Sequence, residues 1–126
     1  MGIEAKNTDL SVDFGKFKLQ NPVMTASGTF GYCDEFDVFL NVKNLGAIVT
    51  KGVTLEERPG NEGRRIFECE AGMINRIGLE NVGIEKFISK KLPELKEKGI
   101  NFVLNIAGSS IEDYVKLGEI SQVNNI

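Results

Sequence analysis

Polar side chains stand late in three apolar stretches of the sequence, at positions where they could bind a ligand. Ser27, Lys51 and Asn105 each come near the end of such a stretch and close to a glycine or another small residue. In α/β proteins the carboxyl ends of parallel strands form the binding face, so we expect these three side chains to meet at one ligand site. Polar residues at strand ends also simply meet solvent, and this second interpretation stays open for Ser27 and Asn105.

Lys51 has the most specific chemistry of the three. It follows the β-branched run 48–50, where a cation lies in surroundings poor in water. Its ammonium is a compact point charge that can stabilise negative charge developing on a ligand. The same side chain, as a neutral amine, could form a Schiff base with a carbonyl compound. The sequence does not separate these two uses.

The segment 75–81 (Asn-Arg-Ile-Gly-Leu-Glu-Asn) is a second candidate site. The side-chain amides of Asn75 and Asn81 can donate and accept hydrogen bonds, which suits a heterocycle with alternating N–H and C=O groups. Gly78 permits close approach to the backbone, so neighbouring N–H groups could bind a carboxylate. The alternative is a surface loop in which asparagine and glycine serve only the turn geometry.

The composition excludes several classes of function. The 126 residues are 41% hydrophobic and 26% charged, as in a soluble globular domain, and include no histidine. The chain alone therefore has no Ser-His-Asp or Cys-His triad, and its two cysteines, Cys33 and Cys69, form no metal-binding pattern. With a net charge of −3, the chain lacks the basic surface expected of a general nucleic-acid binder. No stretch reads as a membrane span or a leader, so we expect a cytoplasmic protein.

Hydrophobic periodicity and turn residues predict the elements that position these candidates. Residues 52–82 hold many glycines and no long regular element, and a connection of this length is typical of a functional loop. The other expected elements are a hairpin over 10–20, a strand from Pro22 with Val23, Met24 and Ala26 buried, a helix 34–42, a strand 47–51, a small hairpin near 65–70, a helix 84–98 kinked or split by Pro93, a strand 102–107, and a helix from a Ser109–Glu112 capping box to about Ile120.

Strands that alternate with helices indicate an α/β fold with a parallel sheet and right-handed crossovers. Two architectures fit this order: a doubly wound sheet, and the N-terminal part of a (β/α)8 TIM barrel, which needs about 250 residues when complete. In the barrel interpretation, residues 1–126 form a single incomplete domain. It comprises an N-terminal hairpin within 1–20 and about three βα units in 21–126, with a long active-site loop at 52–82.

Five blocks of the sequence, taken in order, resemble one family. They are Asn21–Gly31 (NPVMTASGTFG), Thr50–Thr54 (TKGVT), Arg58–Asn61 (RPGN), Gly72–Asn81 (GMINRIGLEN) and Asn105–Ser109 (NIAGS). Together they are similar to the N-terminal part of dihydroorotate dehydrogenase, the FMN-dependent (β/α)8-barrel enzyme of pyrimidine biosynthesis, and most of all to its heteromeric, NAD-linked class. The resemblance runs from residue 9 onward and favours the barrel over the doubly wound sheet.

The resemblance implies a role for each matching position. Ser27, Lys51, Gly52 and Asn105 would line the FMN site, with Lys51 between the flavin and the substrate carboxylate. Asn75 would contact the pyrimidine ring of orotate, and backbone N–H groups near Gly78 and Leu79 would bind its carboxylate. The full set implied for dihydroorotate or orotate is Lys51, Asn75, Arg76, Ile77, Gly78 and Leu79.

The resemblance also implies the reaction and its partners. Dihydroorotate would become orotate as its C5 loses a proton and its C6 passes a hydride to the flavin. A homo-oligomer is expected, together with an iron–sulfur and FAD electron-transfer subunit that links to NAD.

The resemblance places the catalytic base outside this chain. In this class of the family the base is a cysteine on a later loop, and neither Cys33 nor Cys69 takes its place. We therefore expect the base beyond Ile126 and no catalytic residue within residues 1–126. The chain alone is then expected to be an inactive fragment.

Two other functions stay open from the sequence. One is a non-catalytic α/β module that binds a flavin or a pyrimidine, which tight binding of FMN or orotate by a monomeric chain would favour. The other is a different FMN barrel that acts on pyrimidines, such as the reducing domain of dihydropyrimidine dehydrogenase, which substrate assays would distinguish.

Overall fold

The computed structural model describes residues 8–15, 17–33 and 41–126. Its first element is a hairpin of two antiparallel strands, β1 (Val12–Phe14) and β2 (Phe17–Leu19), where the alternating pattern predicted one. Gly15 at the turn has φ +73°, a conformation that glycine adopts without steric cost. The predicted helix 34–42 falls almost wholly outside the described residues, and only the 3₁₀ turn η1 (Val42–Asn44) is described there.

Three segments of the chain pair in parallel. Strands β3 (Ile48–Val49) and β6 (Phe102–Val103) pair in parallel, and isolated parallel bridges join Met24 to Ala47 and Val53 to Ile106. This direction agrees with the predicted α/β fold. The regular strands are shorter than predicted. Of the expected strands 47–51 and 102–107 only β3 and β6 are regular, and the segment from Pro22 contributes only the bridge at Met24.

The predicted burial of the segment 23–26 is wrong for two of its residues. Val23 is 55% exposed and Ala26 is also exposed, while Met24 is half-buried. Met24 bridges to Ala47 alone, so within the described residues the other edge of this segment has no neighbouring strand. With a neighbour on one side only, the side chains of this segment are covered less than those of a strand between two others.

The region predicted as a helix over 84–98 is one helical run with an irregular centre. It consists of α1 (Gly83–Lys86), the π-helical turn η2 (Phe87–Lys91) and α2 (Leu92–Lys98). Pro93 lies in the first turn of α2, directly after the π-helical turn. A proline has no N–H to donate to the preceding turn, so a change of hydrogen-bond pattern there accommodates it without ending the helix. Gly99, with φ +64°, ends the run as predicted.

The last helix, α3 (Ile111–Val123), begins one residue later than predicted. Its N-cap is Ser110, whose Oγ accepts a hydrogen bond from the N–H of Asp113 at 3.1 Å. The carboxylate of Asp113 in turn accepts from the N–H of Ser109 at 2.8 Å. The helix is therefore capped by Ser110 and Asp113 in place of the predicted Ser109 and Glu112, and the carboxylate of Asp113 accepts from the residue before the N-cap, where a capping box would have it accept from the N-cap itself.

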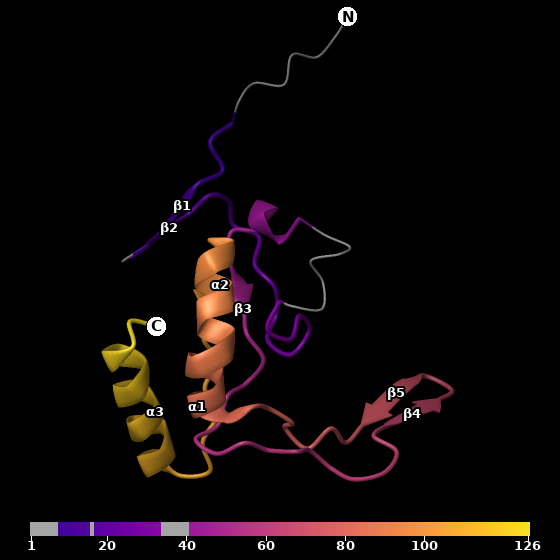
Figure 1. Cartoon of the computed structure of the whole chain (residues 1–126). Coiled ribbons are helices and arrows are strands. Elements are labelled where there is room, and N and C mark those ends of the chain that lie inside the picture. Colours follow the sequence, from indigo (N-terminus) through magenta and orange to yellow (C-terminus); the bar gives the residue numbers. More distant parts are fainter. Residues whose placement is uncertain (1–7, 16, 34–40) are drawn as a thin grey trace, which may run out of the picture.

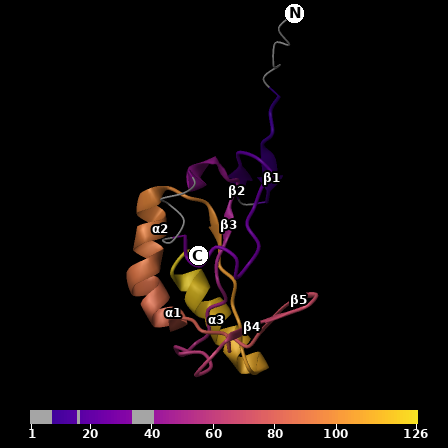
Figure 2. The same cartoon turned by 90° about the vertical axis from the view of Figure 1, so that its right-hand side faces the viewer.

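The hydrophobic core lies between the helices and the parallel segments (Figures 1 and 2). Phe87 is fully buried at its centre, with ring centroids 5.8 Å from Tyr32 and 6.4 Å from Phe102. Leu117 of α3 is equally buried and brings this helix into the same cluster. Each such side chain stabilises the fold by about 1.5–3 kcal/mol through burial.

A second hairpin interrupts the long loop 52–82. Strands β4 (Ile66–Cys69) and β5 (Gly72–Asn75) are antiparallel and lie where the sequence predicted a small hairpin. Figures 1 and 2 place it at the opposite end of the molecule from β1 and β2, and Figure 1 shows it projecting away from the other elements. Arg65 holds its base, because Nη2 donates to the Pro59 carbonyl at 3.0 Å and Nη1 pairs with Glu80.

Candidate functional site

Two of the three polar residues predicted at strand ends are hydrogen-bonded to each other. Nδ2 of Asn105 donates to Oγ of Ser27 at 2.6 Å, and this Oγ donates to the carbonyl of Thr50 at 3.0 Å. The N–H of Asn105 donates to the hydroxyl of Thr50, also at 3.0 Å. Thr50 is fully buried, so this strand-end network has a fixed base. It joins three parallel segments at their carboxyl ends.

Gly52 lies beside the strand-end network and is buried. A Cβ atom at Gly52 would lie 3.3 Å from Nδ2 of Asn105 and 3.4 Å from Cδ1 of Leu79. Any side chain at this position would therefore press on both neighbours. The same contact brings Leu79, from the predicted substrate loop, next to the predicted flavin residues Gly52 and Asn105.

Lys51 lines a cavity of about 580 Å³ and is half-buried. Its backbone N–H donates to the carbonyl of Gly31 at 2.9 Å, which fixes the chain at this point. Ile77 of the predicted substrate loop lines the same cavity. The other lining residues come from the segments 28–32, 57–59 and 80–82. The structure thus brings Lys51 together with one end of the long loop.

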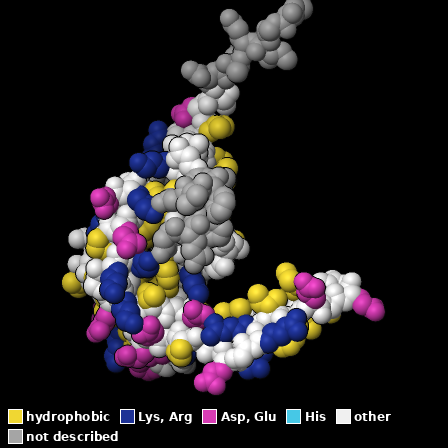
Figure 3. Space-filling view, turned by 45° about the vertical axis from the view of Figure 1, so that its right-hand side comes forward, with side chains coloured by type: hydrophobic (Ala, Val, Ile, Leu, Met, Phe, Trp, Pro, Cys, Tyr) yellow, Lys and Arg dark blue, Asp and Glu magenta, His cyan; other side chains and the backbone are white. Residues whose placement is uncertain are grey.

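Asn75 lies apart from that cavity. It is the last residue of β5 and is exposed, and it does not line the cavity that contains Lys51. Around it, Ile66, Met73 and Ile74 are 50–70% exposed, and the guanidinium carbon of Arg64 lies 5.0 Å from the centre of the Phe67 ring. Figure 3 shows hydrophobic and basic side chains side by side on this hairpin. Lys51 and Asn75, which the resemblance implies to bind the same substrate, therefore do not line one cavity in this structure.

The remaining predicted substrate residues form the return of the loop from the hairpin. The N–H of Arg76 donates to the carbonyl of Arg65 at 2.8 Å, so Arg76 continues the hairpin by one residue pair. Gly78 and Leu79 both have positive φ, +80° and +54°. This left-handed turn carries the chain from the hairpin back to the strand ends, where Leu79 approaches Gly52.

Asn81 plays a different part from the one its residue type suggests. It is 4% exposed, and its side-chain amide is bonded within the chain to Thr54, Leu79 and Gly83. A heterocycle would have to displace these bonds, so the structure favours the alternative in which Asn81 serves the geometry of the loop. Asn81 and Asn75 stand six positions apart in one loop, yet the first is buried and the second is exposed.

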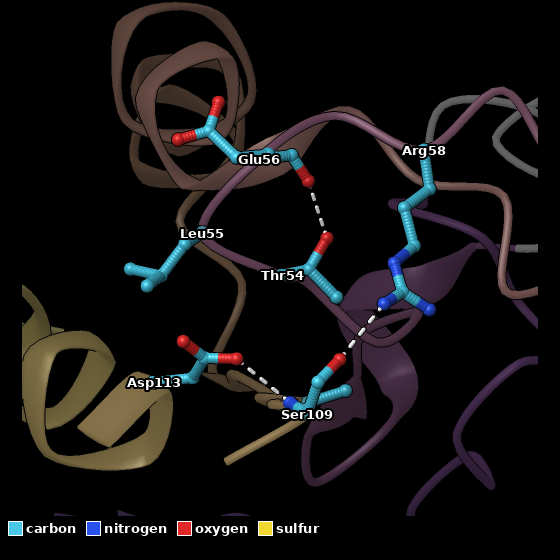
Figure 4. Close-up of a pocket in the computed structure, with 7 residues that line it drawn as sticks. Thr54, Leu55, Glu56, Arg58, Ser109 and Asp113 are labelled. Carbon is cyan, nitrogen blue, oxygen red and sulfur yellow. Dashed lines mark hydrogen bonds between the residues drawn. The ribbon is translucent and has the colours of Figure 1, made fainter.

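Sequence reasoning missed a second cavity of about 270 Å³, which lies against the start of α3 (Figure 4). Nη2 of Arg58 donates to Oγ of Ser109 at 3.0 Å across it, and Thr54 donates to the Glu56 carbonyl. Arg58 also lines the cavity of Lys51, so it stands between the two. Arg58 and Ser109 are 51 residues apart, and no local pattern could have paired them.

Neither cysteine lines the cavity of Lys51 or the cavity at the start of α3. Cys33 is buried and Cys69 is exposed on the hairpin, where its Sγ lies 3.2 Å from the carbonyl oxygen of Gly72. Over the ranges that the structure describes, no group of three or more acidic, cysteine or histidine side chains could hold a metal ion. The helices in those ranges include none that is long and apolar enough to cross a membrane.

Ile126, beyond which the catalytic base is expected, is not itself a site residue. It is half-buried and packs against the hydrophobic core, and its N–H donates to the carbonyl of Ser121 at 3.0 Å just after α3. It lines neither the cavity of Lys51 nor the cavity at the start of α3. Ile126 therefore has a packing role, and the base beyond it stays a prediction.

Comparison with known proteins links this geometry to relatives of greater length. The catalytic subunit of dihydroorotate dehydrogenase B (NAD(+)) from Bacteroides thetaiotaomicron is 47% identical over 112 residues, which cover 89% of this chain and 37% of the relative. The subunit of the same name from Geobacter metallireducens is 49% identical over 114 residues, 90% of this chain and 37% of the relative. The chain thus spans about 37% of the length of these curated relatives.

The fold also matches a solved structure. The dihydroorotate dehydrogenase of Eimeria tenella, in complex with ferulenol, superposes with a TM-score of 0.63 at 19% identity, over 91% of this chain and 34% of that one. The fold is therefore α/β and agrees with part of a barrel. The sequence model of the family described as dihydroorotate dehydrogenase matches residues 9–126. Since this match takes in all the strand-end residues and the whole long loop, the chain belongs to the dihydroorotate dehydrogenase family.

Proposed function

We propose that this chain is the N-terminal portion of a dihydroorotate dehydrogenase that oxidises dihydroorotate to orotate in pyrimidine biosynthesis. The observation that carries the proposal is the strand-end network of Ser27, Thr50 and Asn105, which lies next to Gly52 and the cavity of Lys51. The family membership supplies the reaction. The chain spans about 37% of its relatives, so the remaining parts of the site belong to the rest of the enzyme.

The residues present fit FMN, the cofactor of this family. Gly52 leaves open the space that a Cβ would take beside Asn105 and Leu79, which suits the close approach of a flat ring. The hydroxyl of Ser27, the amide of Asn105 and the ammonium of Lys51 offer polar contacts around that space. FMN, when bound, supplies the hydride acceptor, and Ser27, Lys51, Gly52 and Asn105 would hold it.

Lys51 would supply positive charge at the junction of cofactor and substrate. Lys51 lines the cavity that Ile77 also lines. A fixed cation in a site of low dielectric stabilises negative charge, here the substrate carboxylate and the charge that builds up as hydride is transferred. This electrostatic role is favoured over a Schiff base, because the proposed reaction forms no bond between lysine and substrate.

The substrate would bind between Lys51 and the loop 75–79. Ile77 lines the cavity of Lys51 and Leu79 lies next to Gly52, so one end of that loop is close to the cofactor residues. The N–H groups of Gly78 and Leu79 would bind the carboxylate of dihydroorotate, and Asn75 would reach its ring. Asn75 stands on the projecting hairpin, so its contact requires the hairpin to approach the cavity in the complete enzyme.

The architecture and the assembly complete the proposal. The three parallel segments would be the first strands of a (β/α)8 barrel, with Ser27, Lys51 and Asn105 at its carboxyl face. The relatives are named as the catalytic subunit of an NAD-linked enzyme, which supports an electron-transfer subunit as partner. We place the enzyme in the cytoplasm as a homo-oligomer, with its catalytic base beyond Ile126.

A chimeric enzyme tests this function directly. Residues 9–126 would replace the matching segment of the Geobacter metallireducens catalytic subunit, with the unaltered subunit as control. We expect the chimera to bind FMN and to bleach its visible absorbance when dihydroorotate is added without oxygen. A folded chimera that retains FMN, yet is not reduced by dihydroorotate, would contradict the proposed function. Reduction by dihydrouracil instead would favour an enzyme of the dihydropyrimidine dehydrogenase kind.

A further inference from the structure

The carbonyl groups of the loop 76–79 are held by two asparagines. Nδ2 of Asn61 donates to the carbonyl of Arg76 at 2.8 Å, and the N–H of Asn61 donates to the carbonyl of Ile77 at 3.0 Å. Nδ2 of Asn81 donates to the carbonyl of Leu79 at 2.9 Å. Three of the four carbonyls in the loop are therefore bonded to Asn61 or Asn81.

The amide N–H groups of the same loop are bonded differently. In the described part of the chain, the N–H groups of Arg76 and Asn81 donate to the carbonyls of Arg65 and Arg58, while those of the four residues between them, 77–80, donate to no protein acceptor. The two N–H groups at the centre of this run belong to Gly78 and Leu79. Both residues have positive φ. Successive N–H groups in such a turn form a concave site that favours an anion.

Both asparagines are themselves anchored. A Cβ at Gly78 would lie 2.7 Å from the backbone N and 2.8 Å from Cγ of Asn61, so the two residues are in tight contact. Asn81 is 4% exposed; its Oδ1 accepts from the N–H groups of Thr54 at 3.1 Å and Gly83 at 2.9 Å. Thr54 follows Lys51 by three residues, so Asn81 ties the loop to the strand end that carries the lysine.

We propose that Asn61 and Asn81 are positioning residues for substrate recognition. By fixing the carbonyls of the loop, they hold the N–H groups of Gly78 and Leu79 in place to bind the carboxylate of a pyrimidine substrate. The inference rests on the proposed function and goes beyond it, because it assigns a role to two asparagines whose side-chain amides are bonded to the protein itself. It predicts that their loss weakens recognition of the carboxylate and leaves recognition of the pyrimidine ring unchanged.

The test measures orotate and uracil binding to the FMN-loaded chimera by calorimetry, since uracil has the ring without the carboxylate. For Asn61→Ala we expect orotate affinity to fall about five- to tenfold, as for the loss of one or two hydrogen bonds, and uracil affinity to change less than twofold. Asn81→Ala is the second variant. Asn21→Ala is the matched control, because Nδ2 of Asn21 also holds a carbonyl, that of Asn44 at 2.8 Å, outside this loop.

The outcomes separate this inference from the proposed function. Loss of orotate binding with uracil binding retained supports the positioning role. Equal loss of both ligands means that the asparagines only maintain the fold, and unchanged binding of both means that they do not position the loop; either result overturns the inference. If Asn81→Ala does not fold, Asn61→Ala still decides, since Asn61 is only half-buried. If the chimera that carries none of these substitutions binds no orotate, the proposed function itself is refuted.

Discussion

Asn105 donates a hydrogen bond from Nδ2 to Oγ of Ser27 at 2.6 Å, which joins two residues 78 positions apart. Because Oγ of Ser27 in turn donates a hydrogen bond to the carbonyl of Thr50, the two bonds together link the ends of three parallel segments. The orientation of the Asn105 amide, beside the open space at Gly52, is therefore set by Ser27.

Ser27→Ala removes the acceptor for Asn105 and the donor to Thr50. We expect the affinity of the chimera for FMN to fall about five- to tenfold, and its free energy of unfolding to fall by about 1 kcal/mol. Flavin fluorescence titration and urea denaturation measure the two quantities. Ser121→Ala is the control, since its Oγ donates to the Leu117 carbonyl at 2.7 Å within α3. FMN affinity that is the same in both variants would refute a role for Ser27 in the cofactor site.

Local patterns predicted those elements whose causes are local. The turn at Gly15 and the helix end at Gly99 follow from glycine at positions of positive φ. The parallel direction of β3 and β6 follows from the alternation of strand and helix. The N-cap of α3 was placed one residue early, because Ser109 and Ser110 each have an acidic residue three positions later and only the fold decides between them.

Contacts between distant segments account for what the sequence could not predict. Asn75 and Asn81 have the same side chain in one loop, but Asn81 is buried because Thr54, 27 residues away, bonds to its amide. The exposure of Val23 depends on the absence of a neighbouring strand among the described residues, which no window of sequence reveals. The strand-end residues were identified as candidates from their positions, yet their mutual hydrogen bonds required the structure.

Gly52→Ala tests the space beside the network. The new methyl group would lie 3.3–3.4 Å from Asn105 and Leu79, which is tight but needs only a small shift, so we expect the fold to persist. FMN affinity should fall at least tenfold, because the methyl group fills space that the flavin would use. Fluorescence titration of the chimera measures this, and a normal affinity would place the flavin elsewhere.

Gly118→Ala is the matched control for Gly52→Ala. Gly118 lies inside α3, and a Cβ there would meet nothing within 4 Å. Alanine in a helix interior is more favourable than glycine, so the free energy of unfolding should rise by about 0.5–1 kcal/mol. FMN affinity should not change. A destabilised Gly118→Ala variant would mean that α3 packs differently from the structure.

Leu117→Ala tests how α3 is held to the core. Leu117 is fully buried, so the substitution should leave a cavity and lower the free energy of unfolding by about 2–5 kcal/mol. Val115→Ala is the control on the same helix, because Val115 is 54% exposed and should contribute less than about 0.5 kcal/mol. Urea denaturation of the chimera, followed by circular dichroism, compares the two. Equal effects would show that α3 does not pack through Leu117.

Lys51→Met removes the cation and keeps a side chain of similar length. We expect orotate affinity to fall at least tenfold, since the charged partner of the carboxylate is lost, while uracil affinity changes little. The flavin should also become harder to reduce, because the positive charge that favours the added electrons is gone. Calorimetry and an anaerobic redox titration of the chimera measure these effects. Lys116→Met, on the exposed face of α3, changes the net charge by the same amount and should alter neither orotate affinity nor flavin reduction. If both variants had the same effect, Lys51 would act only through the net charge of the protein and not through its position.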